Sequence, residues 1–497
     1  MHRLGITCLL IALTVPPLIA QDSLQPLVTD SLQPLQIDSL RPLEIDSLQS
    51  EQIDSLHPVE ADRLQPLQID SLHPVTVDNL RMIQTDSLTY RQYLDGDYRS
   101  LIETSRKARQ EGISFYYLNY RTAIAYDALK NYAKAAAFYK ETLSETPDDP
   151  TLKESLYYAY LLSGQKENAA ILARTMAPHT QAIVGYTPSA MDQLSLSGGY
   201  MTNDNKADKH STTGFDSLNQ YQDMIFSALG IGFNLSERAK LKLGYQLYNT
   251  RFQRSAGSAL IKEDNLSQHQ LMAALEFFTP SHITWGFAGG YYNIEKPDIT
   301  LTTTGSYGPG AGRWGYGQSF SYTTSPGKRT SAYSLLAFLN KRFTYTLPEI
   351  AVAYSNFGAV DQYQAKGSLT YYPLGNLHFY GISAAAVIYN PDGWTTTEQY
   401  ILSQHFGVKL FDPLWLDANA SFGNQLNYIS DRSFLVYDTY DPIKALAGLS
   451  LTWYLRRMTV STGYQWQQKE GYAFSANDYT TYKYNNHLVN MALSWNF

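Results

Sequence analysis

Residues that could support catalysis or metal binding are scattered along this sequence rather than grouped. The ten histidines show neither a His-x-x-x-His spacing nor a carboxylate–histidine spacing suited to a metal ion. The sequence contains no Gly-x-Ser-x-Gly elbow and no phosphate-binding loop, and Cys8 is its single cysteine. It therefore predicts no catalytic residue, no metal ligand and no cofactor, and it does not indicate an enzyme. A hydrolase whose residues converge only in the folded chain stays open.

Hydroxyl groups do recur at regular positions near the N-terminus. Aspartate returns every eight residues from Asp22 to Asp86, and a leucine follows two places later each time. Proline in most units rules out a continuous helix, and twelve acidic against three basic residues between Asp22 and Leu88 favour an extended acidic spacer. A small β-solenoid is the alternative, because apolar residues also recur at the sixth and eighth places. Seven units begin Asp-Ser-Leu, and their serines are Ser23, Ser31, Ser39, Ser47, Ser55, Ser71 and Ser87.

These Asp-Ser-Leu units resemble the acceptor motif of the general O-glycosylation system of Bacteroidota, which is Asp, then Ser or Thr, then a methyl-bearing apolar residue. The resemblance implies that the seven serines carry glycans. Arg63 and Asn79 break the motif in two units, so those units are expected to stay unmodified. Turn-forming Asp-Ser pairs copied by duplication explain the same pattern. Both interpretations leave the segment a spacer.

Residues 1–20 have the pattern of a secretory signal peptide. Met1–Arg3 supplies a basic start, Leu4–Leu18 an apolar run, and Ala20–Gln21 a plausible cleavage point. The run is too short for a membrane anchor. A net charge of -7 argues against a nucleic-acid partner. The mean hydropathy of -0.30 argues against a helical membrane protein but allows a β-barrel, in which alternate residues face water.

Residues 89–180 show helical patterning with a fixed period. Gly96, Lys130 and Gly164 fall 34 residues apart, which is the period of tetratricopeptide repeats. The segment resembles three such helical hairpins, and the resemblance implies a concave groove that docks a protein or a polymer. A plain helical bundle is the alternative. The small or aromatic residues at packing positions of the repeat are Ala123, Tyr126, Tyr132, Ala135, Tyr139, Pro147, Tyr160, Gly164 and Ala169.

Residues 181–497 change to an alternation of apolar with small or polar residues, which is typical of strands that face lipid on one side. The last strand ends on an aromatic residue. That ending resembles the assembly signal of bacterial outer-membrane barrels, which implies that the barrel assembly machinery recognises Trp495 and Phe497. The segment is therefore predicted to be a transmembrane β-barrel in contact with outer-membrane lipid. The apolar positions of its last strand are Val489, Met491, Leu493, Trp495 and Phe497.

The alternation predicts fourteen strands, and single-chain bacterial barrels have an even number. Tight connections alternate with long polar ones, such as 294–328 and 429–440, so both barrel ends are expected on the periplasmic side. The glycine-rich segment 305–317 is a candidate surface loop or lumen plug. A soluble β-sandwich is the alternative, but it would not explain the terminal aromatic residue. The predicted strands are 190–201, 221–235, 239–252, 267–279, 282–293, 329–342, 348–358, 361–373, 376–389, 394–411, 414–428, 441–456, 458–469 and 481–497.

The chain is thus predicted to be multi-domain. A signal peptide (1–20) and an extended acidic octapeptide repeat (21–88) precede a periplasmic α-helical, tetratricopeptide-like domain (89–180) and a transmembrane antiparallel β-barrel (181–497). This order resembles surface lipoprotein assembly modulators and exopolysaccharide export porins. Both resemblances imply outward transport of a cargo, with a periplasmic protein or polysaccharide docked by the repeats and the barrel as conduit or insertion platform. The alternative is a structural or adhesive protein that tethers the outer membrane to periplasmic partners.

Overall fold

The computed structural model describes residues 77–497 except 205–216, 257–258, 306–317, 358–359, 392–397, 434, 437–440, 456 and 476–477. The predicted signal peptide, six of the seven repeat serines (Ser23, Ser31, Ser39, Ser47, Ser55 and Ser71) and most of the glycine-rich segment lie outside these residues. The described helices are α4 (Val77–Leu94), α5 (Tyr98–Gln110), α6 (Tyr116–Ala128), α7 (Tyr132–Glu145), α8 (Pro150–Leu162), α9 (Lys166–Ala173) and α10 (Pro178–Ile183). None of them has the length and apolar character that crossing a membrane would require.

Helices α4 to α9 form three helical hairpins whose turns repeat every 34 residues. Gly96, Lys130 and Gly164 occupy the same place in the three turns and have φ values of 67°, 57° and 77°. The residue after each of the first two begins the next helix as its N-cap: Asp97 accepts a hydrogen bond from Ser100 N, and Asn131 accepts one from Lys134 N. The predicted period therefore corresponds to a structural repeat, although membership of the tetratricopeptide class stays a prediction.

The core of the helical region contains most of the residues expected to pack there. Tyr126 is half-buried and stacks on Phe138 at 5.6 Å between ring centroids, and Gly164 lies in its turn. Pro147 differs from the expectation: it is exposed between α7 and α8, where it ends a helix instead of packing. The expected packing residues that are buried are Ala123, Tyr132, Ala135, Tyr139, Tyr160 and Ala169.

The helical region begins earlier than residue 89, because α4 starts at Val77 and takes in the last two repeat units. The reason is visible in the ninth unit. Asp86 is fully buried and pairs with the buried guanidinium of Arg121 on α6 at 2.8 Å. Arg121 also lies between the rings of Tyr90 and Tyr117, with its guanidinium 5.1 and 5.6 Å from their centroids. The repeat thus supplies part of the helical core.

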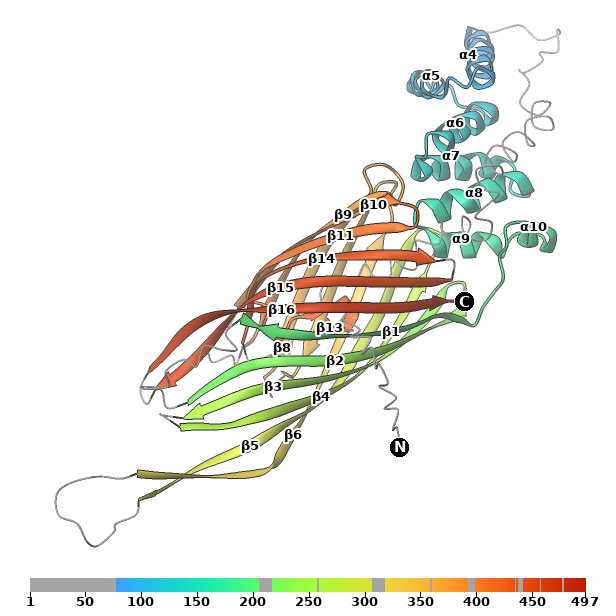
Figure 1. Cartoon of the computed structure of the whole chain (residues 1–497). Helices are drawn as coiled ribbons and strands as arrows, with labels where there is room; N and C mark the ends of the chain where they lie inside the picture. The colour runs from blue at the N-terminus through green and yellow to red at the C-terminus, as the bar shows by residue number, and fades with distance from the viewer. Residues whose placement is uncertain are drawn as a thin grey trace, which may run out of the picture.

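The rest of the chain is a closed antiparallel barrel of fourteen strands, which confirms the predicted fold of this segment (Figure 1). Consecutive strands are neighbours, and β1 pairs with β16 to close the sheet. Two further strands, β12 (Ile429–Ser430) and β13 (Leu435–Val436), form a small separate sheet. The barrel strands are β1 (Met191–Asn203), β2 (Ser217–Ser236), β3 (Ala239–Ala256), β4 (Ala259–Phe278), β5 (Ile283–Gly305), β6 (Gln318–Lys341), β7 (Thr346–Ser355), β8 (Gln362–Tyr371), β9 (Phe379–Tyr389), β10 (Glu398–Phe411), β11 (Leu414–Gly423), β14 (Ile443–Leu455), β15 (Met458–Ser475) and β16 (Asp478–Asn496).

Side chains alternate between an apolar outer surface and a largely polar interior. In β16, Val489, Leu493 and Trp495 point outward and are 54%, 40% and 45% exposed, whereas Asn496 points inward and is 5% exposed. The same alternation places leucine, isoleucine and tyrosine side chains on the outside of the other strands. An apolar exterior without an open strand in the sheet is the arrangement that a β-structure needs in lipid.

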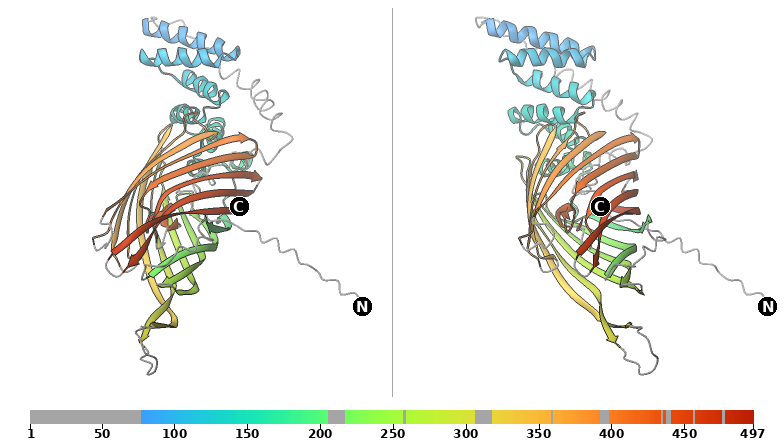
Figure 2. Two further views of the ribbon diagram at one scale, coloured as in Figure 1. Left: turned by 60° about the vertical axis from the view of Figure 1, so that its left-hand side comes forward. Right: turned by 90° about the vertical axis from the view of Figure 1, so that its left-hand side faces the viewer.

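Several hairpins are longer than predicted at the end of the barrel away from the helices. The predicted loop 294–328 is strand up to Gly305 and again from Gln318, and the predicted loop 253–266 is mostly strand. Figure 2 shows the helical region stacked at one end of the barrel and the β5–β6 hairpin reaching away from the other. These extensions were missed because their sequences lack an apolar face.

Candidate functional site

The connection between β11 and β14 folds into the barrel instead of outward. The residues described in it, 424–433 with β13, are called the inward segment here, and Figure 1 shows β13 inside the barrel. The predicted strand 414–428 therefore ends early, at Gly423, and the predicted external loop 429–440 is wrong in its described part. Gly423 has φ of 126°, and a Cβ there would collide with the carbonyl of Tyr400. Only glycine allows the chain to leave the wall at this place.

Arg432 anchors the inward segment to the barrel wall. Its side chain is 4% exposed and forms ion pairs with Glu276 on β4 and with Glu349 on β7, the latter at 3.3 Å. The guanidinium also lies 4.0 Å from the ring centroid of Phe338 on β6. Asn340 donates to the same Glu349 oxygen at 2.9 Å, and Lys242 pairs with Glu276 at 3.4 Å. Arg432, Glu276 and Glu349 are called the Arg432 cluster.

Wall glutamines hold the backbone of the inward segment. Gln364 on β8 donates to the carbonyl of Ile429 at 2.7 Å and accepts from its amide at 3.0 Å. Gln362, two residues earlier, donates to the carbonyl of Asn427 at 2.8 Å. Ile429 packs among buried side chains that include Phe357. The segment is therefore bound to the wall by ion pairs, amide hydrogen bonds and apolar contacts, and its residues Tyr428 to Arg432 are buried.

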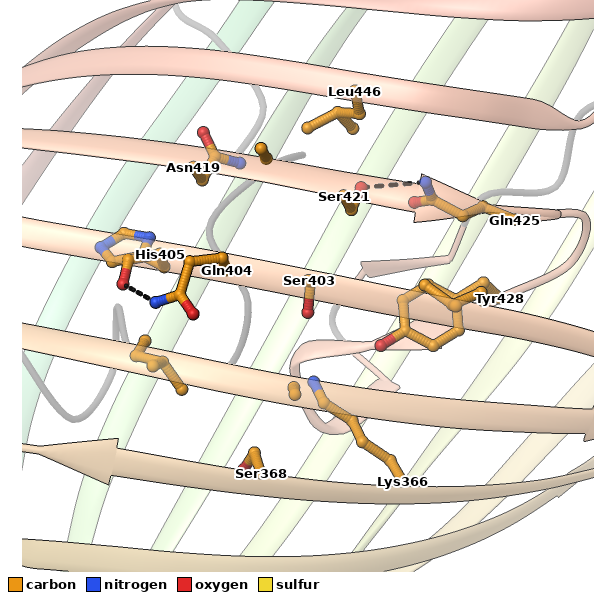
Figure 3. Close-up of a pocket in the computed structure, with 14 residues that line it drawn as sticks. Lys366, Ser368, Ser403, Gln404, His405, Asn419, Ser421, Gln425, Tyr428 and Leu446 are labelled. Carbon is orange, nitrogen blue, oxygen red and sulfur yellow. Dashed lines mark hydrogen bonds between the residues drawn. The ribbon is translucent and has the colours of Figure 1, made fainter.

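A pocket lies between the inward segment and the wall formed by β8 to β11 and β14 (Figure 3). Its cavity volume is only about 30 Å³, and the space of about 540 Å³ around it includes open solvent. Tyr428 of the inward segment and Lys366 lie on the same side of the pocket, and His405 lies across from them. Its lining mixes apolar and uncharged hydrogen-bonding side chains. The apolar ones are Ile382, Ala384, Ile401, Ala420 and Leu446, and the polar ones are Ser368, Ser403, Gln404, Asn419, Ser421 and Gln425.

His405 is oriented by its neighbours, but not toward a nucleophile. Its Nε2 lies 3.1 Å from Asp417 Oδ1, and the hydroxyl of Tyr380 donates to the same oxygen. Among the described residues, no serine hydroxyl is hydrogen-bonded to the ring of His405. No group of three or more His, Cys, Asp or Glu side chains in the described part of the chain could hold a metal ion.

The helical region docks on the turns at one end of the barrel. It contacts four of them, which join β2 to β3, β4 to β5, β6 to β7 and β8 to β9. Side chains from both sides contribute. The polar contacts with these turns include Arg174 with Glu237 at 2.5 Å, Lys140 Nζ with His282 Nε2 at 2.8 Å, Arg342 Nη2 donating to Ser163 O at 2.8 Å, and Asn376 Nδ2 donating to Lys130 O at 2.9 Å.

A buried charge network ties α9 to the barrel beside these turns. Lys240 on β3 pairs with Glu167 of α9 at 3.3 Å and with Asp192 on β1 at 3.1 Å. Lys166 of α9 pairs with the other carboxylate oxygen of Asp192 at 2.9 Å. Ion pairs that are removed from water need all their partners, because an unpaired buried charge is strongly unfavourable. The network therefore fixes α9 on the barrel.

His282 is the titratable group at the centre of this interface. Its ring meets the ring of Tyr160 at 5.7 Å between centroids, and its Nε2 faces the Lys140 amine. Burial, together with the smaller effect of the charges of Lys140, Arg342 and Lys341, lowers the pKa of His282 to about 4. The docked interface is thus built around a neutral imidazole.

None of the described residues that the sequence analysis proposed as functional lies in the pocket or in the Arg432 cluster. Trp495 and Phe497 lie on the outer surface at the end that carries the helices, and Phe497 N donates to Asp192 O at 3.1 Å. Ser87 is exposed on α4. The inward segment and the Arg432 cluster were missed entirely. The sequence gives one indication of this cluster. Strands β4 and β7 each have a carboxylate at an inward position, and a buried carboxylate needs a cation from another part of the chain.

Comparisons with known proteins add little beyond the barrel itself. No protein-family model and no curated protein matches the chain. The crystal structure of a Pseudomonas aeruginosa FadL homologue is 10% identical, covers 66% of this chain and 94% of its own, and has a TM-score of 0.43. The Pseudomonas putida toluene transporter TodX is 9% identical over 64% and 92%, with a TM-score of 0.40. A bacterial polysaccharide outer membrane secretin is 7% identical over 63% and 100%, with a TM-score of 0.30. Similarity this low carries no argument about substrate, and the chain's own strand pairing establishes the barrel.

Proposed function

We propose that this chain is an outer-membrane export or surface-assembly protein. In this proposal the helical region receives a protein or polysaccharide cargo in the periplasm, and the barrel passes the cargo outward or inserts it. The observation that carries the proposal is the docking of the helical region on four turns around one barrel mouth. A cargo bound by the helices is therefore held at the entrance, where its effective concentration is high.

The orientation follows from the lengths of the connections. On the helical side, β2–β3, β10–β11 and β14–β15 are joined by two residues each. On the other side, strands extend into long hairpins or are followed by longer connections. Bacterial outer-membrane barrels have short turns in the periplasm and long loops outside. The helical region is thus assigned to the periplasm, and Trp495 and Phe497 to the inner rim, where the barrel assembly machinery acts.

The inward segment favours transport over a purely structural role. It is a polar segment held in the lumen by contacts that can be exchanged, next to a pocket lined with hydrogen-bonding groups. A barrel that served only as an anchor would need an apolar exterior but no bound segment of this kind. The second candidate, a tether, is favoured by the acidic repeat that precedes the helices, because such a charged extended segment could reach periplasmic partners.

Deletion of residues 77–178 tests the proposal. The deleted protein is expected to insert, since the barrel is closed by its own strands, but to lose surface display of the cargo. Heat-modifiable migration checks insertion, and surface labelling of whole cells compares the glycan and lipoprotein profiles. A control carries Leu80→Ala, a change on the exposed side of α4, and should display the cargo normally. Unchanged surface profiles after the deletion would contradict export and favour the tether.

A further inference from the structure

We infer that the helical region controls the Arg432 cluster through two strands of the barrel wall, so that a cargo engaging the helices frees the inward segment. The inference rests on the proposed function, because freeing the segment matters only where the lumen is a conduit. Its basis is an arrangement found at the end of β6 and again at the start of β3. In each place one side chain contacts the helical region, and the side chain two residues away in the chain contacts the Arg432 cluster.

The first connection runs along the end of β6. Arg342, just beyond the strand, donates to the carbonyl of Ser163 at the C-cap of α8. Asn340, two residues earlier and on the same face, donates to Glu349, which pairs with Arg432. Phe338, two residues earlier again, lies under the Arg432 guanidinium. A displacement of α8 that pulls Arg342 therefore acts on the strand end that holds Glu349 and Phe338 in place.

The second connection runs along the start of β3. Lys240 pairs with Glu167 of α9, and it lies opposite Glu276 in the strand register. Lys242, two residues later, forms the ion pair with Glu276 that neutralises this carboxylate together with Arg432. Movement of α9 therefore changes the positions of the cations around Glu276. The two connections begin on adjacent helices of the same hairpin and end on the two carboxylates that hold one arginine.

The inward segment is able to have two arrangements. Its contacts with the wall are side-chain hydrogen bonds, ion pairs and apolar contacts, with one backbone hydrogen bond near its start, from Gln425 N to Ile443 O at 3.0 Å, and its short ladder is internal to β12 and β13. It can leave the wall without breaking a barrel strand pair. Arg432 has a positive φ of 52°, a conformation that is unfavourable for a residue other than Gly, Asn or Asp, so its buried ion pairs hold it against a backbone preference.

Single-channel recording of the full-length protein in planar bilayers tests this coupling. Arg432→Met breaks the cluster directly and is expected to raise the open fraction. Arg342→Gln and Lys240→Met are each expected to raise it by roughly 2- to 30-fold, the range of typical coupling between sites. Neither change should add to the effect of Arg432→Met, since the coupling acts through that residue. Lys240→Arg keeps a positive charge for the ion pairs, so this variant should have the same open fraction as the unmodified protein.

Arg174→Gln is the matched control, because Arg174 also forms an ion pair across the same interface but joins neither connection. It is expected to behave like the unmodified protein. Heat-modifiable migration verifies that each variant has a folded barrel. If Arg432→Met opens the barrel while Arg342→Gln and Lys240→Met match the control, or if their effects add to that of Arg432→Met, the coupling is wrong. If Arg432→Met itself leaves the conductance unchanged, the proposed conduit closed by the inward segment is wrong.

Discussion

Arg432 of the inward segment and Glu276 of β4 form a buried ion pair although 156 residues separate them in the chain. Glu349 joins them from β7, so one guanidinium is shared by two carboxylates inside the barrel. This pairing is the main electrostatic link between the inward segment and the wall. Removal of any one charge of the Arg432 cluster leaves the remaining charges unbalanced.

The double variant Glu276→Gln/Glu349→Gln is expected to destabilise the protein by about 3–5 kcal/mol, because it removes both carboxylates that form ion pairs with the buried Arg432. Adding Arg432→Met should recover most of this loss, since the cation is then removed as well. Urea unfolding in detergent, followed by tryptophan fluorescence, measures both changes. A triple variant as unstable as the double variant would show that the charge is not the cause.

Lys130→Gly is expected to stabilise the helical region by about 0.5–1 kcal/mol. Lys130 has φ of 57° at the turn where the neighbouring hairpins have glycine, and a side chain is unfavourable in that conformation. Lys130→Ala is the matched control, because it removes the long side chain but keeps the Cβ. Denaturation followed by circular dichroism at the helical wavelength separates the two. Equal stabilities of the glycine and alanine variants would contradict the backbone argument.

Docking of the helical region is expected to weaken as the pH falls from about 6.5 to about 4. The docked pKa of His282 is about 4, below the usual 6.5, so the undocked ring takes up a proton more readily in this window. The stabilisation is fully present above pH 6.5 and is lost progressively toward pH 4. Hydrogen exchange of α7 and α8 measures it, and His282→Gln should remove this part of the pH dependence. A variant that keeps the full dependence would assign it to another group.

Phe497→Ser is expected to reduce assembly of the barrel several-fold. The side chain is 48% exposed on the outer surface, so its loss removes little internal packing. The matched control is Phe422→Ser, which removes an outward aromatic residue that is 62% exposed but lies away from the C-terminus. The fraction of heat-modifiable protein in isolated outer membranes is the measurement. Similar assembly of both variants would contradict a terminal signal.

Ser87 is expected to carry less glycan in the native host than the other six Asp-Ser-Leu serines. Ser87 itself is exposed, but Asp86, the acidic residue of its motif, is fully buried against Arg121. An enzyme that reads the motif after folding cannot reach this carboxylate. Mass spectrometry of peptides from Asp22 to Leu88 gives the occupancy at each serine. Full occupancy at Ser87 would indicate modification before folding, and unmodified serines throughout would leave only the spacer interpretation.

The barrel was predictable because lipid and water impose a period of two on the strands that cross the membrane. The outward residues of β16 from Val489 to Trp495 show this directly, and the total of fourteen strands was correct. The helical turns were predictable because Gly96 and Gly164 mark left-handed positions at equal spacing. The start of the helical region was not, because Asp86 looks like every other aspartate of the repeat until Arg121 is placed beside it.

The lumen site was not predictable from local sequence. Asn424 to Arg432 is polar and resembles an external loop, and its inward course depends on Glu276, Glu349 and Gln364, which belong to three different strands. The sequence of a short segment does not show which distant side chains will contact it in the folded protein. The interface around His282 has the same character, because its partners lie on α7 and α8, more than a hundred residues earlier.

The unequal lengths of β6 and β7 have a consequence for contacts outside the membrane. The pairing of these strands ends at Ser334 and Ser355, and Asn356 adds hydrogen bonds to the backbone of Tyr333, so residues 318–332 of β6 have β5 as their neighbour but no second neighbour among the described strands. In the closed part of the sheet each described strand has a neighbour on both sides. Beyond it, the β5–β6 ribbon presents backbone N–H and C=O groups along both of its outer sides, because the pairing of β5 with β4 also ends, at Glu295. Such exposed edges are where extended segments of other chains add as new strands.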